Sequence, residues 1–178
     1  TDPDLAGETV VVGAHMDHLG LGHHGGSLGG AADADQIHNG ADDNASGTAG
    51  LLGIAEMLAA RDDLRRTVVF VAFSAEEWGL LGSRYYLENP VGSPTDIVAM
   101  INMDMIGRAA DGKVIVEGTD SSVDFAGLVE RLGSDTQLKL DMPPKVSPNS
   151  DHAPFYEDEV PVLNFFTGLH PQYHRPSD

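Results

Sequence analysis

The chain has 178 residues, 41% of them hydrophobic, and its 28 acidic residues against 10 basic ones give a formal net charge of -18 at pH 7. This charge argues against nucleic acid or an anionic membrane surface as a partner, and no stretch approaches the roughly 18 apolar residues of a membrane-spanning helix. Because cysteine is absent, the strong metal ligands available are histidine, aspartate and glutamate.

Short apolar runs alternate with helical patterns along the chain. Helices are predicted over residues 45–64, with Ser46 as a cap and Arg61 near the end, over 79–90, which Pro90 closes, and over 122–134. The expected buried strands are residues 9–14, 67–74, 97–103, 113–118 and 160–166. The alternation predicts an α/β fold, a three-layer αβα sandwich with a mostly parallel mixed central sheet.

Acidic and histidine side chains follow three of these strands. His15 and Asp17 follow the first, Glu76 and Glu77 the second, and Asp104 the third. A single strand-end aspartate is more often a turn or cap residue than a ligand, and paired glutamates are usually solvated. Their coincidence at the carboxyl ends of successive strands, which meet at one edge of a parallel sheet, favours a metal site.

The ligand types indicate which metal this site would hold. Imidazole and carboxylate ligands without sulfur fit zinc in a catalytic role, with manganese or cobalt as substitutes, better than calcium or magnesium. The acidic loop at residues 39–47 and the histidines of residues 170–178 add further ligands. There are more carboxylates than one ion needs, so we expect two divalent cations joined by a shared carboxylate.

Five motifs carry a resemblance to a known family. In this order, "GAHMDHLG", "NGADDNASG", "FSAEEWGLLGS", "NMDMIG" and "YHRPSD" closely resemble the co-catalytic zinc aminopeptidases related to bacterial leucyl aminopeptidase, aminopeptidase Y and glutamate carboxypeptidase. The resemblance runs from about Glu8 to Asp178. It implies the zinc exopeptidase fold, two zinc ions, and a peptide or small protein with a free N-terminus as the substrate.

The resemblance also implies a role for each motif residue. It assigns His15 and Asp104 to one zinc ion, Glu77 and His174 to the other, and Asp43 to both, with a cis peptide bond between Asp43 and Asn44. His170 is the alternative to His174 as the last ligand.

The resemblance further implies how a peptide bond is cleaved. Glu76 would be the general base for a water that bridges the zinc ions, and Asp17 would orient His15 from behind. The implied reaction is metal-dependent removal of N-terminal residues from peptides.

Several other residues have two interpretations. Met105, Phe166 and Leu169 are candidates for an apolar substrate pocket that prefers large apolar N-terminal residues, although Phe166 fits the core equally well. Asp151 and His152 either support the substrate pocket or form a plain turn. Four histidines in or beside the glycine-rich residues 20–34, which are expected to form a loop, are interpreted as surface residues: His18, His23, His24 and His38.

The resemblance leads to further expectations about the whole chain. Residues 1–178 would be a single zinc peptidase catalytic domain, truncated at both ends and without a protease-associated domain, from a secreted or periplasmic protein. Two alternatives share the fold: a single-zinc glutaminyl cyclase, and a non-catalytic receptor-like binding module. A third, an acidic calcium-binding domain, does not suit the histidine ligands.

Overall fold

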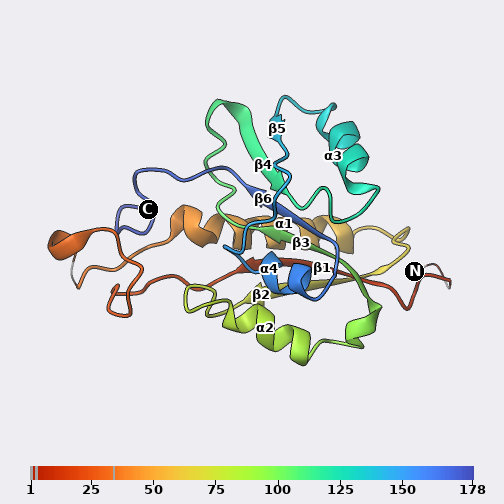
Figure 1. Cartoon of the computed structure of the whole chain (residues 1–178), viewed down its shortest axis with the longest axis horizontal. Coiled ribbons are helices and arrows are strands. Elements are labelled where there is room, and N and C mark those ends of the chain that lie inside the picture. The colour runs from red at the N-terminus through yellow and green to blue at the C-terminus, as the bar shows by residue number, and fades with distance from the viewer. Residues whose placement is uncertain (1, 3, 34) are drawn as a thin grey trace.

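A six-stranded sheet runs through the centre of the computed structural model, which describes residues 2, 4–33 and 35–178 (Figure 1). The strand order is β2-β1-β3-β6-β4-β5. Neighbouring strands are parallel except β4 and β6, which are antiparallel. The strands are β1 (Thr9–His15), β2 (Thr67–Phe73), β3 (Ile97–Met103), β4 (Lys113–Glu117), β5 (Lys139–Asp141) and β6 (Val162–Phe166). The predicted mostly parallel mixed sheet is confirmed.

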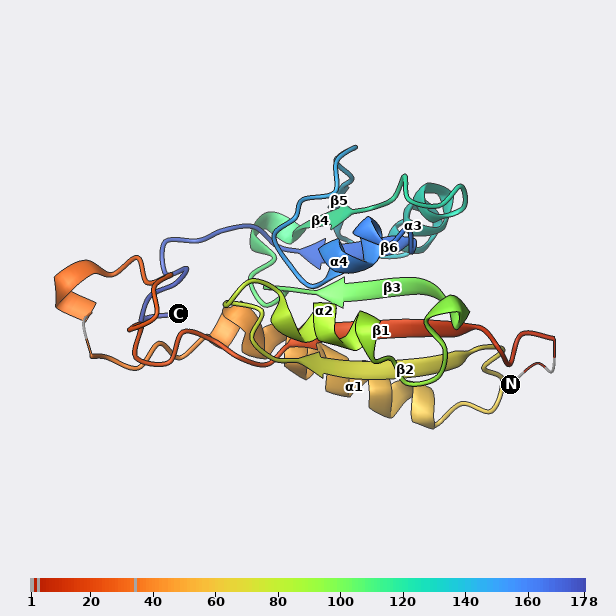
Figure 2. The same ribbon diagram turned by 60° about the horizontal axis from the view of Figure 1, so that its bottom comes forward.

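Helices cover both faces of this sheet (Figure 2). Successive residues of a strand point to opposite faces, and Val12 packs in a cluster with Leu51 of α1, whereas Val11 packs in a cluster with Tyr86 of α2 and Phe155 of α4. The helices therefore form two outer layers. They are α1 (Gly47–Ala59), α2 (Leu81–Glu88), α3 (Phe125–Gly133) and α4 (His152–Glu157), with short turns at Gly30–Asp33, Ala41–Ser46, Pro94–Asp96 and Ala110–Gly112.

The structure corrects the start of the first predicted helix. Ser46 does not cap α1, because its hydroxyl donates to the carbonyl of Asp42 at 2.7 Å. The side chain of Asn44 takes this role instead and accepts a hydrogen bond from the N–H of Gly47 at 2.9 Å. The helix ends at Ala59, so Arg61 lies beyond it.

Two elements were not predicted from the sequence. Strand β5 has only 3 residues, too few to show an alternating pattern. Helix α4 contains Pro154, a residue that usually argues against a helix but is tolerated in the first turn, where its missing N–H has no partner to lose. Gly30–Asp33 forms a short helical turn inside the expected loop, and Ala34 lies outside the described residues.

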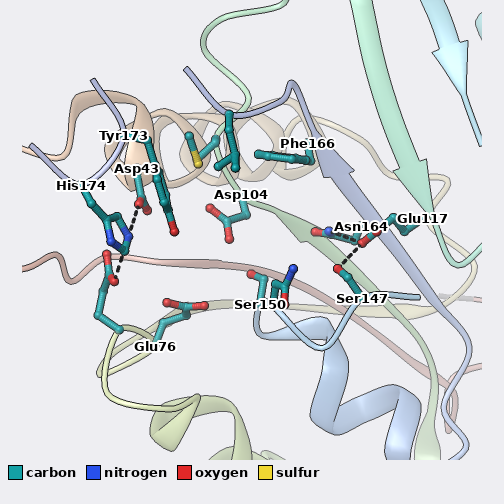
Figure 3. Close-up of a pocket in the computed structure, with 14 residues that line it drawn as sticks. Asp43, Glu76, Asp104, Glu117, Ser147, Ser150, Asn164, Phe166, Tyr173 and His174 are labelled. Atoms are coloured by element: carbon teal, nitrogen blue, oxygen red, sulfur yellow. Dashed lines mark hydrogen bonds and ion pairs between the residues drawn. The ribbon is translucent and has the colours of Figure 1, made fainter. Parts of the chain in front are cut away.

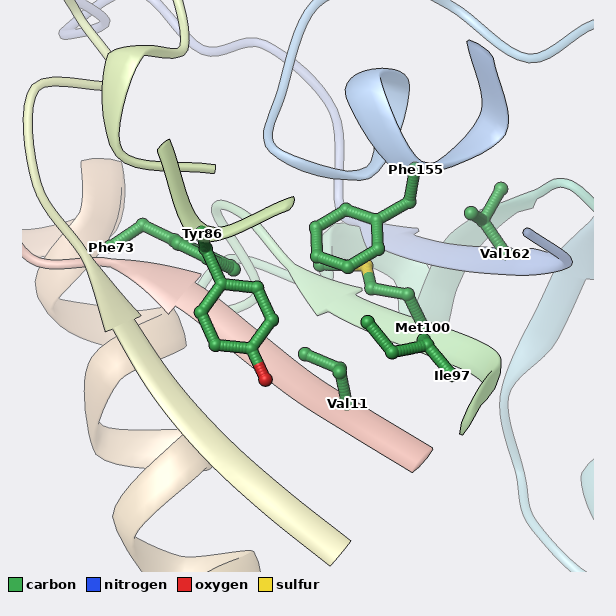
Figure 4. Close-up of a cluster of buried hydrophobic side chains, with 7 residues drawn as sticks. All are labelled: Val11, Phe73, Tyr86, Ile97, Met100, Phe155 and Val162. Atoms are coloured by element: carbon green, nitrogen blue, oxygen red, sulfur yellow. The ribbon is translucent and has the colours of Figure 1, made fainter. Parts of the chain in front are cut away.

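The core on the α2 and α4 face is aromatic (Figure 4). The ring of Phe73 meets those of Tyr86 and Phe155 edge to face, with centroids 6.1 and 6.2 Å apart. The remaining members of this cluster are Val11, Ile97, Met100 and Val162. This packing holds α2 and α4 against the strands whose carboxyl ends carry the predicted ligands.

The carboxyl ends of β1, β3 and β6 point to the side of the molecule where residues 16–33 and the C-terminus lie (Figure 1). No helix among the described residues has both the length and the apolar character needed to cross a bilayer.

Candidate metal centre

Three strands deliver acidic and histidine side chains to one edge of the sheet, and Figure 3 shows two of these side chains, Glu76 and Asp104. His15 is the last residue of β1, Asp104 directly follows β3, and Glu76 and Glu77 follow β2. Because these strands are parallel neighbours, their carboxyl ends are adjacent. The structure thus brings these four side chains to the same edge of the sheet.

Asp43 reaches the same place from the loop that precedes α1. The peptide bond between Asp43 and Asn44 is cis, as the resemblance implies. The side chain of Asn44 fastens this loop to the end of β3, since it donates to the carbonyl of Met103 at 3.0 Å and accepts from the N–H of Met105 at 3.1 Å. Gly47 is also required here, because a Cβ atom would meet the side chain of Asn44 and the Met103 carbonyl.

The carboxylate of Asp43 lies between two groups of potential ligands. His15 Nε2 is 3.3 Å from Asp43 Oδ1 and 3.4 Å from Asp104 Oδ1. His174 Nε2 is 3.2 Å from Asp43 Oδ2 and 3.3 Å from Glu77 Oε2. Asp43 therefore offers one oxygen to each group, as a bridging carboxylate would.

In both His15 and His174, a main-chain carbonyl lies close to Nδ1 and orients the ring so that Nε2 faces the carboxylates. His15 Nδ1 lies 3.1 Å from the main-chain carbonyl of Asp17, and His174 Nδ1 lies 2.8 Å from the carbonyl of Gly26. An Nδ1–H that donates to a carbonyl leaves the lone pair on Nε2, which is the usual arrangement of a metal-bound histidine. Asp17 thus supports His15 through its main chain, whereas its carboxylate is 3.8 Å from the ring.

The donor set fits zinc. One group of potential ligands is His15, Asp43 and Asp104, and a second is His18, Asp43 and Glu77, with His174 close to the same two carboxylates. Cysteine is absent from the sequence, so all these ligand atoms are nitrogen or oxygen. Asp104 Oδ1 is buried and makes no hydrogen bond within the described part of the chain. Because a buried carboxylate oxygen without a partner is costly, this atom is explained by a cation.

His18 and His38 correct the interpretation of these histidines as surface residues. The side chain of His18 is 8% exposed, and its Nδ1 lies 2.7 Å from Glu77 Oε1. His38 is 3% exposed and bonds Ser27 Oγ at 2.7 Å. The glycine-rich segment folds back over the site, where Leu28 N–H donates to the carbonyl of His174, so histidines near a flexible sequence become buried. The closeness of His18 to His15 and Asp17 in the sequence was the one signal that could have placed His18 at the site.

The other two histidines of that group, His23 and His24, are exposed as predicted. His170, the alternative last ligand, lies with a different pair of carboxylates. Its Nε2 is 3.3 Å from Asp42 Oδ2 and 3.3 Å from Asp178 Oδ1. The structure brings His174, not His170, to Asp43 and Glu77.

Asp178 was not expected to take part in the site. Its Oδ2 accepts hydrogen bonds from the main-chain N–H groups of Asp42 and Asp43, at 3.3 and 3.0 Å. The guanidinium of Arg108 lies 3.5 Å from its Oδ1. Asp178 therefore anchors the loop that carries the bridging carboxylate.

Glu76 and Glu77 differ in their surroundings. The carboxylate of Glu77 pairs with His174 and His18; burial opposes its ionisation, but the hydrogen bonds from these histidines outweigh burial and lower its pKa. The carboxylate of Glu76 makes no hydrogen bond within the described residues and lines a cavity. Burial raises the pKa of Glu76 to about 9 in the metal-free chain, and positive charge from metal ions would lower it.

The histidine ligands show the opposite shift. Burial disfavours their charged form, but the negative carboxylates close to each ring outweigh it. Asp104 and Asp43 raise the pKa of His15 to about 12, and Asp43 and Glu77 raise the pKa of His174 to about 10. In the metal-free chain the protons therefore occupy the positions that metal ions would take.

A cavity of about 400 Å³ opens beside these ligands (Figure 3). Met105, Phe166 and Leu169 all line it. Its other walls were not predicted from the sequence; they are Glu117, Ser147, Asn149, Ser150, Asn164 and Tyr173. These residues come from β4, β6 and loops far apart in the chain, and no local motif marks them.

Asp151 and His152 do not line this cavity but lie behind it. Both are fully buried at the start of α4. Asp151 accepts a hydrogen bond from Ser83 Oγ at 2.5 Å, and burial raises its pKa to about 6. His152 Nε2 lies 3.6 Å from Glu117 Oε2. Asp151 directly precedes α4 and His152 begins it, so this segment starts a helix and is not a plain turn before a strand.

The family described as Peptidase family M28 matches residues 2–178. The chain is 33% identical over 141 residues to leupeptin-inactivating enzyme 1 of Streptomyces exfoliatus, covering 75% of the chain and 31% of that protein. It is 31% identical over 153 residues to aminopeptidase YwaD of Bacillus subtilis (strain 168), covering 78% and 32%. The chain thus spans about a third of the length of these curated relatives.

Solved structures have the same fold. The zinc aminopeptidase BSAP from Bacillus subtilis superposes with a TM-score of 0.75 at 26% identity, covering 100% of the chain and 42% of that structure. A glutaminyl cyclase from Porphyromonas gingivalis superposes with a TM-score of 0.72 at 20% identity, covering 98% and 64%. At this lower identity the likeness shows the fold alone.

Proposed function

The chain belongs to peptidase family M28, and from that premise we propose that it is the catalytic part of an aminopeptidase that removes N-terminal residues from peptides with the help of two zinc ions. The observation that carries the proposal is the position of Asp43, with one carboxylate oxygen near His15 and Asp104 and the other near His174 and Glu77. Two ligand groups joined by one carboxylate are typical of a two-metal hydrolase.

Each zinc ion would have its own residues. His15 and Asp104 would hold one, Glu77 and His174 the other, and Asp43 would contact both. When bound, the ions supply positive charge that polarises a peptide carbonyl and makes a water molecule more acidic. Manganese or cobalt would suit the same nitrogen and oxygen ligands.

Glu76 is the proposed general base. Its carboxylate faces the cavity, free of hydrogen bonds within the described residues, and its main-chain N–H is held by Asp17 at 3.1 Å. In this position it would accept a proton from the attacking water and donate it to the leaving amine.

The test combines metal titration with peptide cleavage. We expect zinc to bind with a stoichiometry of about two, and the loaded chain to release N-terminal residues from short peptides until a chelator is added. Glu76→Gln, or Glu76→Ala, should keep both zinc ions and lose about 10²- to 10⁴-fold in kcat. Full zinc loading without release of N-terminal residues, or full activity of Glu76→Ala, would contradict the mechanism.

The same experiment separates the alternatives that share the fold. One bound zinc ion and conversion of an N-terminal glutamine to pyroglutamate would indicate a glutaminyl cyclase. Binding of peptides without turnover, with zinc present, would indicate a receptor-like module.

A further inference from the structure

Glu117 places a carboxylate at the end of the cavity away from the proposed metal ligands. It is the last residue of β4 and is paired across the sheet with Asn164 of β6. Figure 3 shows Glu117, Ser147 and Asn164 together at one end and His174, Asp43 and Glu76 at the other. The side chain of Glu117 is 14% exposed, and it belongs to neither ligand group.

Hydrogen bonds hold this carboxylate in place. Ser147 Oγ donates to Glu117 Oε2 at 2.8 Å, and Asn164 Nδ2 donates to the same atom at 3.1 Å. The amide of Asn164 is itself oriented, because its Oδ1 accepts from Asn102 Nδ2 at 3.0 Å. Both hydrogen bonds to Glu117 use its Oε2 atom. The other oxygen, Oε1, makes no hydrogen bond in the described part of the chain, so it is available to a ligand.

The negative charge of Glu117 has no basic partner in the cavity. No lysine or arginine is among the described residues that line it. His152 Nε2 is 3.6 Å away, but burial lowers the pKa of His152, so its ring is neutral at pH 7. Metal ions would balance the carboxylates at the other end of the cavity, whereas no lysine or arginine among the described lining residues balances Glu117.

Apolar side chains line the same cavity. Met105 follows β3, Phe166 is the last residue of β6, and Leu169 lies in the loop after β6. An apolar wall followed by a carboxylate matches a side chain with an aliphatic stem and a cationic end, because lysine and arginine bury their methylene groups along apolar surface while the charge meets a polar partner.

We propose that this cavity accepts a basic N-terminal side chain, with its methylene groups along Met105 and Phe166 and its cationic group on Glu117. The inference rests on the proposed function, which would place the α-amino group and the scissile bond at the metal end. The substrate would then carry lysine or arginine at its N-terminus, in place of the large apolar residue expected from the sequence. Glu117 would then determine specificity without taking part in the chemistry.

The test compares ligands that differ in one group. L-lysine and L-norleucine have the same four-carbon side chain, and only lysine carries the terminal ammonium. In calorimetric titrations of the zinc-loaded protein we expect lysine to bind at least about tenfold more tightly than norleucine. Glu117→Gln, whose amide oxygen can still accept from Ser147 and Asn164, should remove this difference. Glu130→Gln removes the same charge at an exposed position of α3. It is the matched control and should retain the difference between lysine and norleucine.

The outcomes decide between the two proposals. Equal binding of lysine and norleucine by the wild-type protein, binding of neither, or a lysine preference that persists in Glu117→Gln would overturn the role of Glu117. The wild-type comparison alone is decisive if Glu117→Gln does not fold. Cleavage of lysyl and norleucyl peptides is measured separately, so selective binding without cleavage would count against the aminopeptidase and leave the binding site intact.

Discussion

The main-chain N–H of Glu76 donates a hydrogen bond to Asp17 Oδ1 at 3.1 Å. Asp17 also supports His15 through its main-chain carbonyl. One residue therefore sets both a proposed zinc ligand and the proposed general base, although these lie at the ends of different strands.

Replacement of Asp17 should reduce turnover more than binding. In Asp17→Ala the N–H groups of Glu76 and Glu77 lose their acceptor, so we expect kcat to fall about 10- to 100-fold with little change in KM. The main-chain carbonyl that orients His15 remains, and zinc content should stay near that of the wild type. Steady-state kinetics and metal analysis test this, and an unchanged kcat would refute it.

His174 and His18 should differ in their effect on zinc content. His174 Nε2 faces both Asp43 and Glu77, whereas His18 makes its short contact with Glu77 alone. We expect His174→Ala to reduce the zinc stoichiometry from about two to about one, and His18→Ala to retain about two ions at about 10- to 100-fold weaker affinity. The reverse pattern would make His18 the ligand.

Zinc binding should release protons. In the metal-free chain the pKa values of His15 and His174 lie at about 12 and about 10, so both rings are protonated at pH 7 and must lose a proton to bind zinc. The apparent affinity should therefore rise with pH, by about tenfold per unit for each proton released. Calorimetry in two buffers of different ionisation enthalpy counts the protons, and zinc binding without proton release would contradict the assignment.

Removal of the Asp178 carboxylate should loosen the bridging ligand. Asp178→Ala leaves the N–H groups of Asp42 and Asp43 without their acceptor, and we expect zinc affinity to fall about 10- to 100-fold. Asp178→Asn keeps an oxygen that can accept these bonds and should lie closer to the wild type. Equal zinc affinity of Asp178→Ala and wild type would show that the loop holds Asp43 without this anchor.

The aromatic core should account for a large share of the stability. Phe155 is fully buried and its ring contacts those of Phe73 and Tyr86. Phe155→Ala should lower the free energy of unfolding by about 3–5 kcal/mol, measured by denaturant unfolding. Tyr156→Ala, the exposed neighbour on α4, is the control and should change it by less than about 1 kcal/mol.

Much of the fold and of the metal site could be predicted from the sequence because the signals are local. Apolar runs mark the buried strands, and His15, Glu77 and Asp104 lie within a few residues of strand ends. Strand β5 was missed because it is too short to show a pattern. Helix α4 was missed because His152 and Pro154 in its first turn do not indicate a helix.

The sequence by itself determined which side chains are available as ligands. Each motif and each strand end is marked by residues that are close together in the chain, so both can be recognised locally. Only the tertiary structure decided which of them meet. His174 and Gly26 are hydrogen-bonded across a sequence separation of 148. His18 lies against Glu77 and His174, which come from distant segments, and Glu117 faces the cavity because β4 pairs with β6. Such contacts form between segments far apart in the chain, where no local pattern of residues records them.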